Sequence, residues 1–334
     1  MSQFTIGDLA QSTMMRLQST RMKTELTKLT EELSTGIVAD IGTHLGGDVG
    51  FYADVENNLR LLDAFDLAAN EASHFADVTQ STLDRIAARL GSSVESTLPA
   101  TTTAYQEVRD HAAKDARNDL ETIVAALNST TAGRSLFAGA ATDTTPLVGP
   151  TDFLDTLKAA LPPITDPASL VTAINDWFDD PAGYDTIAYQ GSTNDIAPVM
   201  IAKDSSVQMA VRADAEQFKE VLKGLSLSAL ATDSDWGFDI DEQIEVFDAA
   251  ASVMLNAQSS LTSLQADIGA AQERIESAKT RNAAARIGFE QARTTLVGAD
   301  AFETATRLDD VQVRLESLYA VTARMSRLSL LNYI

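Results

Sequence analysis

The sequence predicts a mainly α-helical protein, in which the N- and C-terminal flanks form a long antiparallel helical rod or coiled-coil bundle around a small α+β insertion domain. Two patterns lead to this fold class. Seven of the eight prolines lie between Pro146 and Pro198, and proline breaks the interior of a helix. In the proline-poor flanks, apolar residues recur at alternating steps of three and four, which places them along one side of a helix.

The N-terminal flank carries three such apolar seams. The first is expected to end at Gly36, and the second runs from Val55 until Gly91, where a helix end is expected. A third helix is expected to start near Thr103, because Gln106 completes a capping-box pattern three residues later. The first seam consists of Met15, Ser19, Met22, Leu26, Leu29 and Leu33.

The C-terminal flank has the longest seam. It is expected to open at Asp239, with Glu242 at the third helical position of a capping box. A helix over residues 240–297 would be about 87 Å long at 1.5 Å per residue. After Gly298, Asp300 is expected to start a last helix. The seam of that helix consists of Leu308, Val311, Leu315, Leu318, Thr322 and Met325.

The window between the flanks has a different pattern. Residues 196–203 and 207–212 are expected to form two short strands around a turn at Asp204 and Ser205, followed by an amphipathic helix around Phe218. Because helices lie on both sides of this insertion, the C-terminal flank is expected to return antiparallel to the N-terminal flank. The predicted domains are a terminal helical assembly domain (1–35 with 299–334), a helical rod (36–139 with 240–298) and a variable insertion (140–239).

The charge is distributed unevenly along the chain. The formal net charge is -23, yet residues 1–35 carry four acids and four bases, and residues 274–334 carry seven acids and nine bases. Residues 36–273 therefore hold 37 of the acids and only 12 of the bases. Copies of the chain would repel through their middles, whereas their near-neutral ends could approach. Nucleic acid is not an expected partner, because phosphate binding requires clustered lysine and arginine.

No residues in the sequence form a recognisable catalytic, cofactor or metal site. Cysteine is absent, and His44, His74 and His111 are scattered. The acidic run from Asp233 to Glu242 does not follow the order of an EF-hand and is better explained as a helix start. No enzyme activity, cofactor or metal is therefore expected. No signal peptide and no membrane-spanning segment are expected either, because no long apolar stretch occurs.

Several short segments resemble the flagellin family. The sequence LSTG at residues 33–36 is similar to that family's L-S-[ST]-G, and residues 268–276 resemble its G-A-x-x-N-R-[LI]-E segment. GRSLFAG at residues 133–139, with TTPL at 144–147 and YQG at 189–191, resembles the flagellar junction proteins.

The last residues carry a further resemblance. LSLLNYI at residues 328–334 is similar to the L-S-L-x-[DN]-Y-[LI] end of hook–filament junction subunits. The sequence departs from the family's pattern at two places. Residues 42–50 stand where the family has a D-D-P-A-G segment, and Glu273 stands where the G-A-x-x-N-R-[LI]-E segment has asparagine. The resemblance covers both flanks and fades in the insertion.

The resemblance implies a structural subunit of the bacterial flagellum, which joins hook to filament by polymerising through its terminal helices. It implies export through the flagellar apparatus without a cleaved signal peptide, and an extracellular location. The implied partners are other copies of the chain, a hook-side junction protein, flagellin and an export chaperone. A filament-forming flagellin and a cytoplasmic coiled-coil adaptor are the alternatives. The predicted assembly interface consists of Met22, Leu26, Leu29, Leu33, Leu308, Leu315, Leu318, Met325, Leu328, Leu330, Leu331 and Tyr333.

Overall fold

The protein is mainly helical, as predicted. The computed structural model describes the backbone of residues 6–331 and the side chains of residues 10–325. The chain divides into a terminal unit (Met1–Asp63 with Ala283–Ile334) and a central unit (Ala64–Asn282). The helices are α1 (Ile6–Thr35), α2 (Ile41–His44), α3 (Gly50–Thr97), the 3₁₀ turn η1 (Leu98–Thr101), α4 (Gln106–Leu127), α5 (Phe153–Ala160), α6 (Pro167–Asp179), α7 (Tyr184–Ile187), α8 (Glu216–Leu230), α9 (Ile240–Val297) and α10 (Ala301–Leu331).

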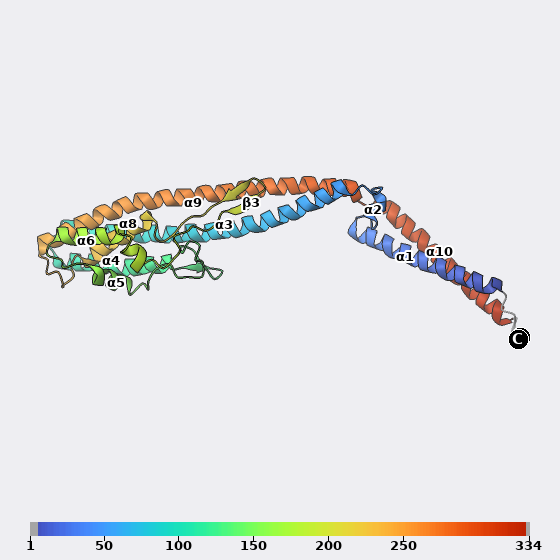
Figure 1. Ribbon diagram of the computed structural model, residues 1–334, viewed down its shortest axis with the longest axis horizontal. Coiled ribbons are helices and arrows are strands. Elements are labelled where there is room, and N and C mark those ends of the chain that lie inside the picture. The colour runs from blue at the N-terminus through green and yellow to red at the C-terminus, as the bar shows by residue number, and fades with distance from the viewer. Residues whose placement is uncertain (1–5, 332–334) are drawn as a thin grey trace. The chain divides into compact units, whose positions relative to one another are not determined.

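Helices α1 and α10 lie side by side in the terminal unit (Figure 1). Contacts along the pair run in opposite directions on the two helices. The sulfur of Met15 accepts a hydrogen bond from Thr322 at 3.8 Å, whereas Glu25 lies 3.8 Å from Arg307. The two ends of the sequence are therefore antiparallel partners, which confirms the predicted return of the C-terminal flank.

Two glycines lie where the helices of the terminal unit end, Gly36 after α1 and Gly298 between α9 and α10. Gly36 ends α1 with a φ of +69°, a left-handed conformation that favours glycine. Its carbonyl oxygen accepts a hydrogen bond from the N–H of Ala299 at 2.9 Å, and the N–H of Val38 donates to Val297 at 2.9 Å. The end of α1 is thus tied to the break between α9 and α10 by backbone hydrogen bonds, around the isolated bridge between Ile37 and Gly298.

The same antiparallel order holds where α3 and α9 pass through the central unit. The amide of Gln272 donates to Asp77, and that of Gln265 donates to Asp84, both at 2.7 Å. Between these polar pairs, the seams of both helices are buried; Leu83 and Ile275 are examples that are fully covered. Burial along such a stripe stabilises helices that would be marginal alone. The sequence-predicted capping box also forms, because Asp239 and Glu242 exchange backbone-to-side-chain hydrogen bonds of 2.8 and 3.0 Å.

The smaller helices α4, α5, α6 and α8 gather at the end of the central unit where α3 ends and α9 begins (Figure 1). Helix α8 is almost entirely buried. An aromatic cluster fills the space beside it, with ring centroids 4.9–6.5 Å apart in mostly edge-to-face arrangements. The cluster consists of Phe153, Trp177, Phe178 and Tyr184.

The insertion's family-like segments are brought together by backbone hydrogen bonds. Ser192 donates its N–H to Ala138 at 2.9 Å, and Gln190 donates to Pro146 at 2.8 Å. Leu147 also forms an isolated bridge with Tyr189. Residues 133–139, 144–147 and 189–191, which are far apart in sequence, therefore form one continuous substructure.

Two predicted helix boundaries are wrong. Helix α3 does not stop at Gly91 but continues to Thr97, because only Pro99 in the following 3₁₀ turn breaks it. The predicted capping box at Thr103 does not form, since α4 begins at Gln106 after an uncapped Tyr105. The Gln106 side chain is instead used in tertiary contacts, and its oxygen accepts a 2.8 Å hydrogen bond from Arg109.

The predicted hairpin is present, but its first strand is shorter than the predicted 196–203, and its second strand overlaps the predicted 207–212 only at Val207. Strands β3 (Val199–Ala202) and β4 (Ser205–Val207) form an antiparallel hairpin, so that Ser205 belongs to a strand and not to the turn. A second small hairpin, β1 (Thr130–Thr131) with β2 (Arg134–Ser135), was not predicted. The β3 carbonyl of Ile201 accepts a 2.8 Å hydrogen bond from Asn282 of α9. Short strands carry too few residues for an alternating pattern to be recognised.

Two glycines of the C-terminal flank should respond oppositely to alanine. A Cβ at Gly269, inside α9, would meet no other part of the chain, whereas a Cβ at Gly298 would clash with the carbonyl oxygen of Thr294. We expect Gly269→Ala to raise the free energy of unfolding by about 0.5–1 kcal/mol, because alanine loses less backbone entropy in a helix. Gly298→Ala should lower it. Urea denaturation of both variants tests the pair, and a destabilised Gly269→Ala protein would contradict the assignment of that position to an unobstructed helix face.

Candidate assembly surface

The apolar seams of α1 and α10 are covered to different degrees. Leu29 is 1% exposed, and Val311 and Thr304 of α10 are buried as well. Six of the predicted interface residues are half-buried, and Leu33 is exposed. The six are Met22, Leu26, Leu308, Leu315, Leu318 and Met325. The side chains of Leu328, Leu330, Leu331 and Tyr333 lie outside the described residues, so that part of the predicted interface stays a prediction.

Polar contacts flank the α1–α10 seam. The ammonium of Lys23 lies 5.9 Å from the centroid of the Tyr319 ring, a cation–π arrangement. Hydrogen bonds from Lys23 and Ser19 lower the pKa of the Tyr319 hydroxyl, because they stabilise its charged form. Glu32, which is buried, accepts a 3.0 Å hydrogen bond from the N–H of Ala39. The contacts of Tyr319 with Lys23 and Ser19 join α1 to α10, whereas that of Glu32 holds the segment after α1.

The outer faces of the terminal unit expose many apolar side chains. Eleven of the eighteen large apolar side chains that are exposed in the described part of the chain belong to this unit, although it is the smaller of the two. Phe302 is 84% exposed, Ile287 68% and Met14 64%. The remaining eight are Leu17, Leu33, Val49, Phe51, Leu61, Val313, Tyr319 and Val321. A concentration of exposed apolar side chains in one unit favours an interaction surface there.

The exposed set is largely distinct from the predicted seam. On α10, Phe302 precedes the buried Val311 by nine residues, which is half a turn out of phase at 100° per residue. Val313 lies almost on the same side as Phe302 by this count. The predicted seam therefore faces the partner helix, whereas other apolar residues face outward. Their signal in the sequence was the presence of apolar residues out of register with the heptad, such as Met14, Leu17 and Phe302.

The described residues hold no cluster of histidine, aspartate and glutamate side chains suited to a metal ion. No helix among them is long and apolar enough to span a membrane. His74 lies 3.3 Å from the hydroxyl of Thr131, and His111 lies 3.8 Å from Asp115.

Two protein-family models match this sequence, one in its N-terminal part and one in its C-terminal part. The model for the bacterial flagellin N-terminal helical region matches residues 6–142, and the model for the bacterial flagellin C-terminal helical region matches residues 252–334. The chain belongs to the flagellin family. In this flagellin-family chain, the matched regions contain the whole of α1, α3, α4 and α10, and most of α9.

A solved structure shares the fold of this flagellin-family protein. It is described as a flagellar hook-associated protein from Vibrio parahaemolyticus, and it superposes with a TM-score of 0.51 over 73% of this chain and 94% of its own, at 12% sequence identity. Among curated proteins, none matches the sequence.

Membership of the flagellin family identifies the protein as a structural subunit of the bacterial flagellum, where flagellin-family chains polymerise with other axial proteins. The unmatched residues 143–251 comprise the helices α5 to α8 and the β3–β4 hairpin. This segment also includes the first residues of α9, so the matched helices lie towards the two ends of the sequence.

Proposed function

We propose that this protein joins the flagellar hook to the filament by polymerising through its terminal unit. The observation that carries the assembly role is the concentration of exposed apolar side chains on that unit. Exposed apolar surface is removed from water when copies associate, and this burial is the main driving force of association.

The near-neutral charge of the terminal segments supports the same proposal. Residues 1–35 and 274–334 have few excess charges, whereas residues 36–273 hold the acidic excess. Copies in contact through their ends would avoid most of the repulsion between their middles. The assignment to the junction, rather than to the filament, depends on the resemblance of residues 328–334 to the end of junction subunits.

Removing residues 328–334 tests this assignment. We expect the truncated chain to keep a folded central unit, because that unit ends at Asn282. Incorporation into the flagellum should be abolished, and motility should be lost with it. Circular dichroism and protease resistance would report the folded unit, and immunoblots of sheared flagella would report incorporation. Normal swimming by cells that carry only the truncated chain would contradict the proposal.

Immunogold labelling distinguishes the junction role from that of a filament subunit. A junction subunit would label one short zone between hook and filament, whereas a filament-forming flagellin would label the whole filament. Recovery of the chain only from cytosol would favour the coiled-coil adaptor.

We also propose that the chain is exported without a cleaved signal peptide and is escorted by a chaperone. Intact Met1 in the extracellular protein would support that route.

A further inference from the structure

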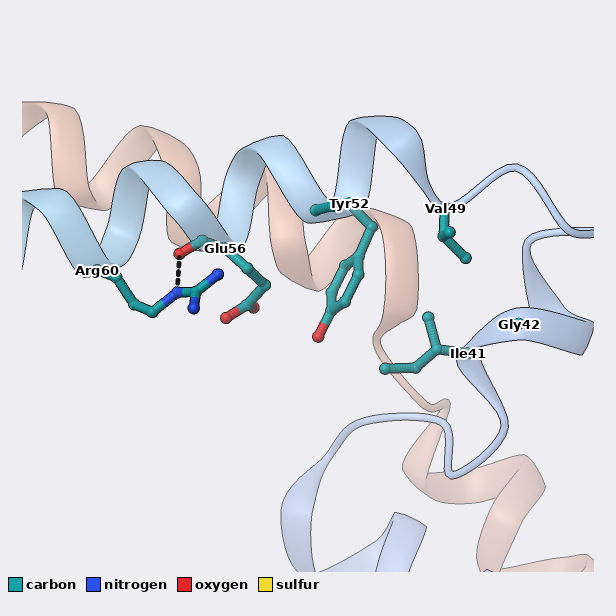
Figure 2. A pocket seen from close by; sticks show the side chains of 7 residues that line it. Ile41, Gly42, Val49, Tyr52, Glu56 and Arg60 are labelled. Carbon is teal, nitrogen blue, oxygen red and sulfur yellow. Dashed lines mark hydrogen bonds between the residues drawn. The ribbon is translucent and has the colours of Figure 1, made fainter.

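An open pocket of about 600 Å³ lies in the terminal unit, between α2 and the start of α3. Figure 2 shows Tyr52, Glu56 and Arg60 projecting from the same side of α3, while Ile41 of α2 projects towards the Tyr52 ring. Val49 lines the mouth and is 43% exposed. The pocket thus offers apolar walls and one polar edge to an incoming side chain.

The loop that builds this pocket is one in which the chain departs from the family's D-D-P-A-G pattern. Asp40 caps α2, accepting hydrogen bonds from the N–H of Thr43 at 3.1 Å and from its hydroxyl at 2.7 Å. Gly46 and Gly47 then reverse the chain with φ values of +61° and +90°. This local structure holds Ile41 opposite α3, so the pocket is a property of this sequence.

The polar edge of the pocket consists of Glu56 and Arg60. The carboxylate of Glu56 lies 3.8 Å from Arg293 of α9, which offsets its charge. Arg60 donates one hydrogen bond, from Nε to the carbonyl oxygen of Glu56 at 3.3 Å (Figure 2). Among the described residues, no carboxylate forms an ion pair with Arg60. Its guanidinium therefore remains available to an acidic partner.

A side chain of complementary character is displayed elsewhere on the same unit. Phe302 lies in the first turn of α10 and is 84% exposed, the highest value among the large apolar residues of the described chain. Asp300 caps the helix beside it, accepting hydrogen bonds from the N–H groups of Phe302 and Glu303 at 2.9 and 3.0 Å. The Glu303 carboxylate is exposed and forms no ion pair within the described residues. Phe302 is thus an exposed aromatic side chain with two acidic neighbours, Asp300 and Glu303.

We propose that Phe302 of one copy inserts into the pocket beside Tyr52 of the next copy, with Glu303 next to Arg60. Phe302 and the pocket occupy different places on the terminal unit, so the contact is head-to-tail. It leaves one free Phe302 and one free pocket at the ends of any open assembly. Such heterologous contacts produce rings or open helical arrays. The inference rests on the proposed function, because it names the contact through which the terminal unit would polymerise.

Cross-linking tests the contact directly, because the chain contains no cysteine. Gly42→Cys adds a thiol at the pocket, where a Cβ meets nothing closer than 3.9 Å. Ala301→Cys adds one beside the intact Phe302. The two single variants are mixed, allowed to polymerise and treated with a short bismaleimide. We expect covalent dimers from the mixture, none from either variant alone, and a ladder of oligomers from the double variant.

A matched control uses Ala320→Cys, which lies on the same face of α10 as Phe302 but five turns, or about 27 Å, further along. It should not cross-link to Gly42→Cys. Polymers that form normally without the Gly42–Ala301 cross-link would overturn this contact and leave the proposed function intact. A chain that never polymerises, alone or with purified axial proteins, would overturn both. Cross-linking of Gly42→Cys to another flagellar protein would also overturn the proposal that a second copy of this chain occupies the pocket.

Two sets of substitutions provide an independent measurement. Phe302→Ala should raise the critical concentration for polymerisation by about tenfold or more, as for a central interface residue. Val313→Ala, a similarly exposed residue on the same helix face, should change it much less. Arg60→Glu and Glu303→Arg should each weaken polymerisation, and their combination should restore it. Failure of the combined variant to recover, with each single effect present, would contradict the proposed ion pair.

Discussion

Replacing Leu29 by aspartate is expected to separate α1 from α10 and to abolish polymerisation. Leu29 is 1% exposed, and the Glu25–Arg307 contact sets a register that places it about level with the buried Thr304. A carboxylate here would lose the buried apolar contact and would be desolvated. Arg307 lines the same hollow but already lies 3.8 Å from Glu25, so it would offset only part of that cost. The new carboxylate would also lie one turn from the buried Glu32. The combined cost is about 3–5 kcal/mol.

Hydrogen exchange measures this effect where it occurs. We expect the amides of α1 and α10 to lose protection in Leu29→Asp, while the amides of α8 in the central unit keep theirs. Leu17→Asp is the matched control, because Leu17 lies on the same helix and is 56% exposed. It should leave the helix pair protected. Unchanged protection of α1 in Leu29→Asp would refute the view that the two ends hold each other in solution.

Removing the side chain of Arg109 is expected to cause the largest loss of stability in the central unit. This arginine is fully buried and has no carboxylate partner among the described residues. Its guanidinium instead donates hydrogen bonds to three neutral oxygens: that of the Gln243 side chain at 3.0 Å, the Thr103 carbonyl at 2.6 Å and the Gln106 side chain at 2.8 Å. It therefore links α4, the preceding loop and the start of α9.

Arg109→Ala should lower the free energy of unfolding of the central unit by roughly 3 kcal/mol, because the packing of a fully buried side chain and three hydrogen bonds from a charged donor are lost together. Arg109→Lys should recover little of this, since an ammonium cannot reproduce the planar set of donors. Lys114→Ala, on the exposed side of α4, is the control and should change stability by less than about 0.5 kcal/mol. Chemical denaturation monitored through Trp177 and Trp236 compares the variants, and equal effects of Arg109→Ala and Lys114→Ala would contradict this role.

The Arg109 contacts also explain why one sequence prediction failed. Thr103 and Gln106 have the spacing of a capping box, but the carbonyl of Thr103 and the side chain of Gln106 both accept hydrogen bonds from Arg109. A charged donor in a buried site competes successfully with a local cap worth about 1 kcal/mol. Gly91 is a second example of a failed local signal. Helix α3 continues through Gly91, which lies opposite the side chain of Gln258 of α9. Local signals are weak when tertiary contacts oppose them.

The sequence by itself determined the long helices, the break points at Gly36 and Gly298, the capping box at Asp239 and the antiparallel return of the chain. These features depend on residue spacing and on backbone restrictions that act over a few residues, so they can be recognised without a partner. The tertiary structure decided how completely each apolar residue is covered, including those that lie outside the heptad seams. A heptad seam and an isolated residue such as Phe302 are equally apolar in sequence, and only packing of α1 against α10 covers the first and exposes the second. The Ile41–Tyr52 pocket likewise depends on a loop whose glycine conformations bring α2 against α3.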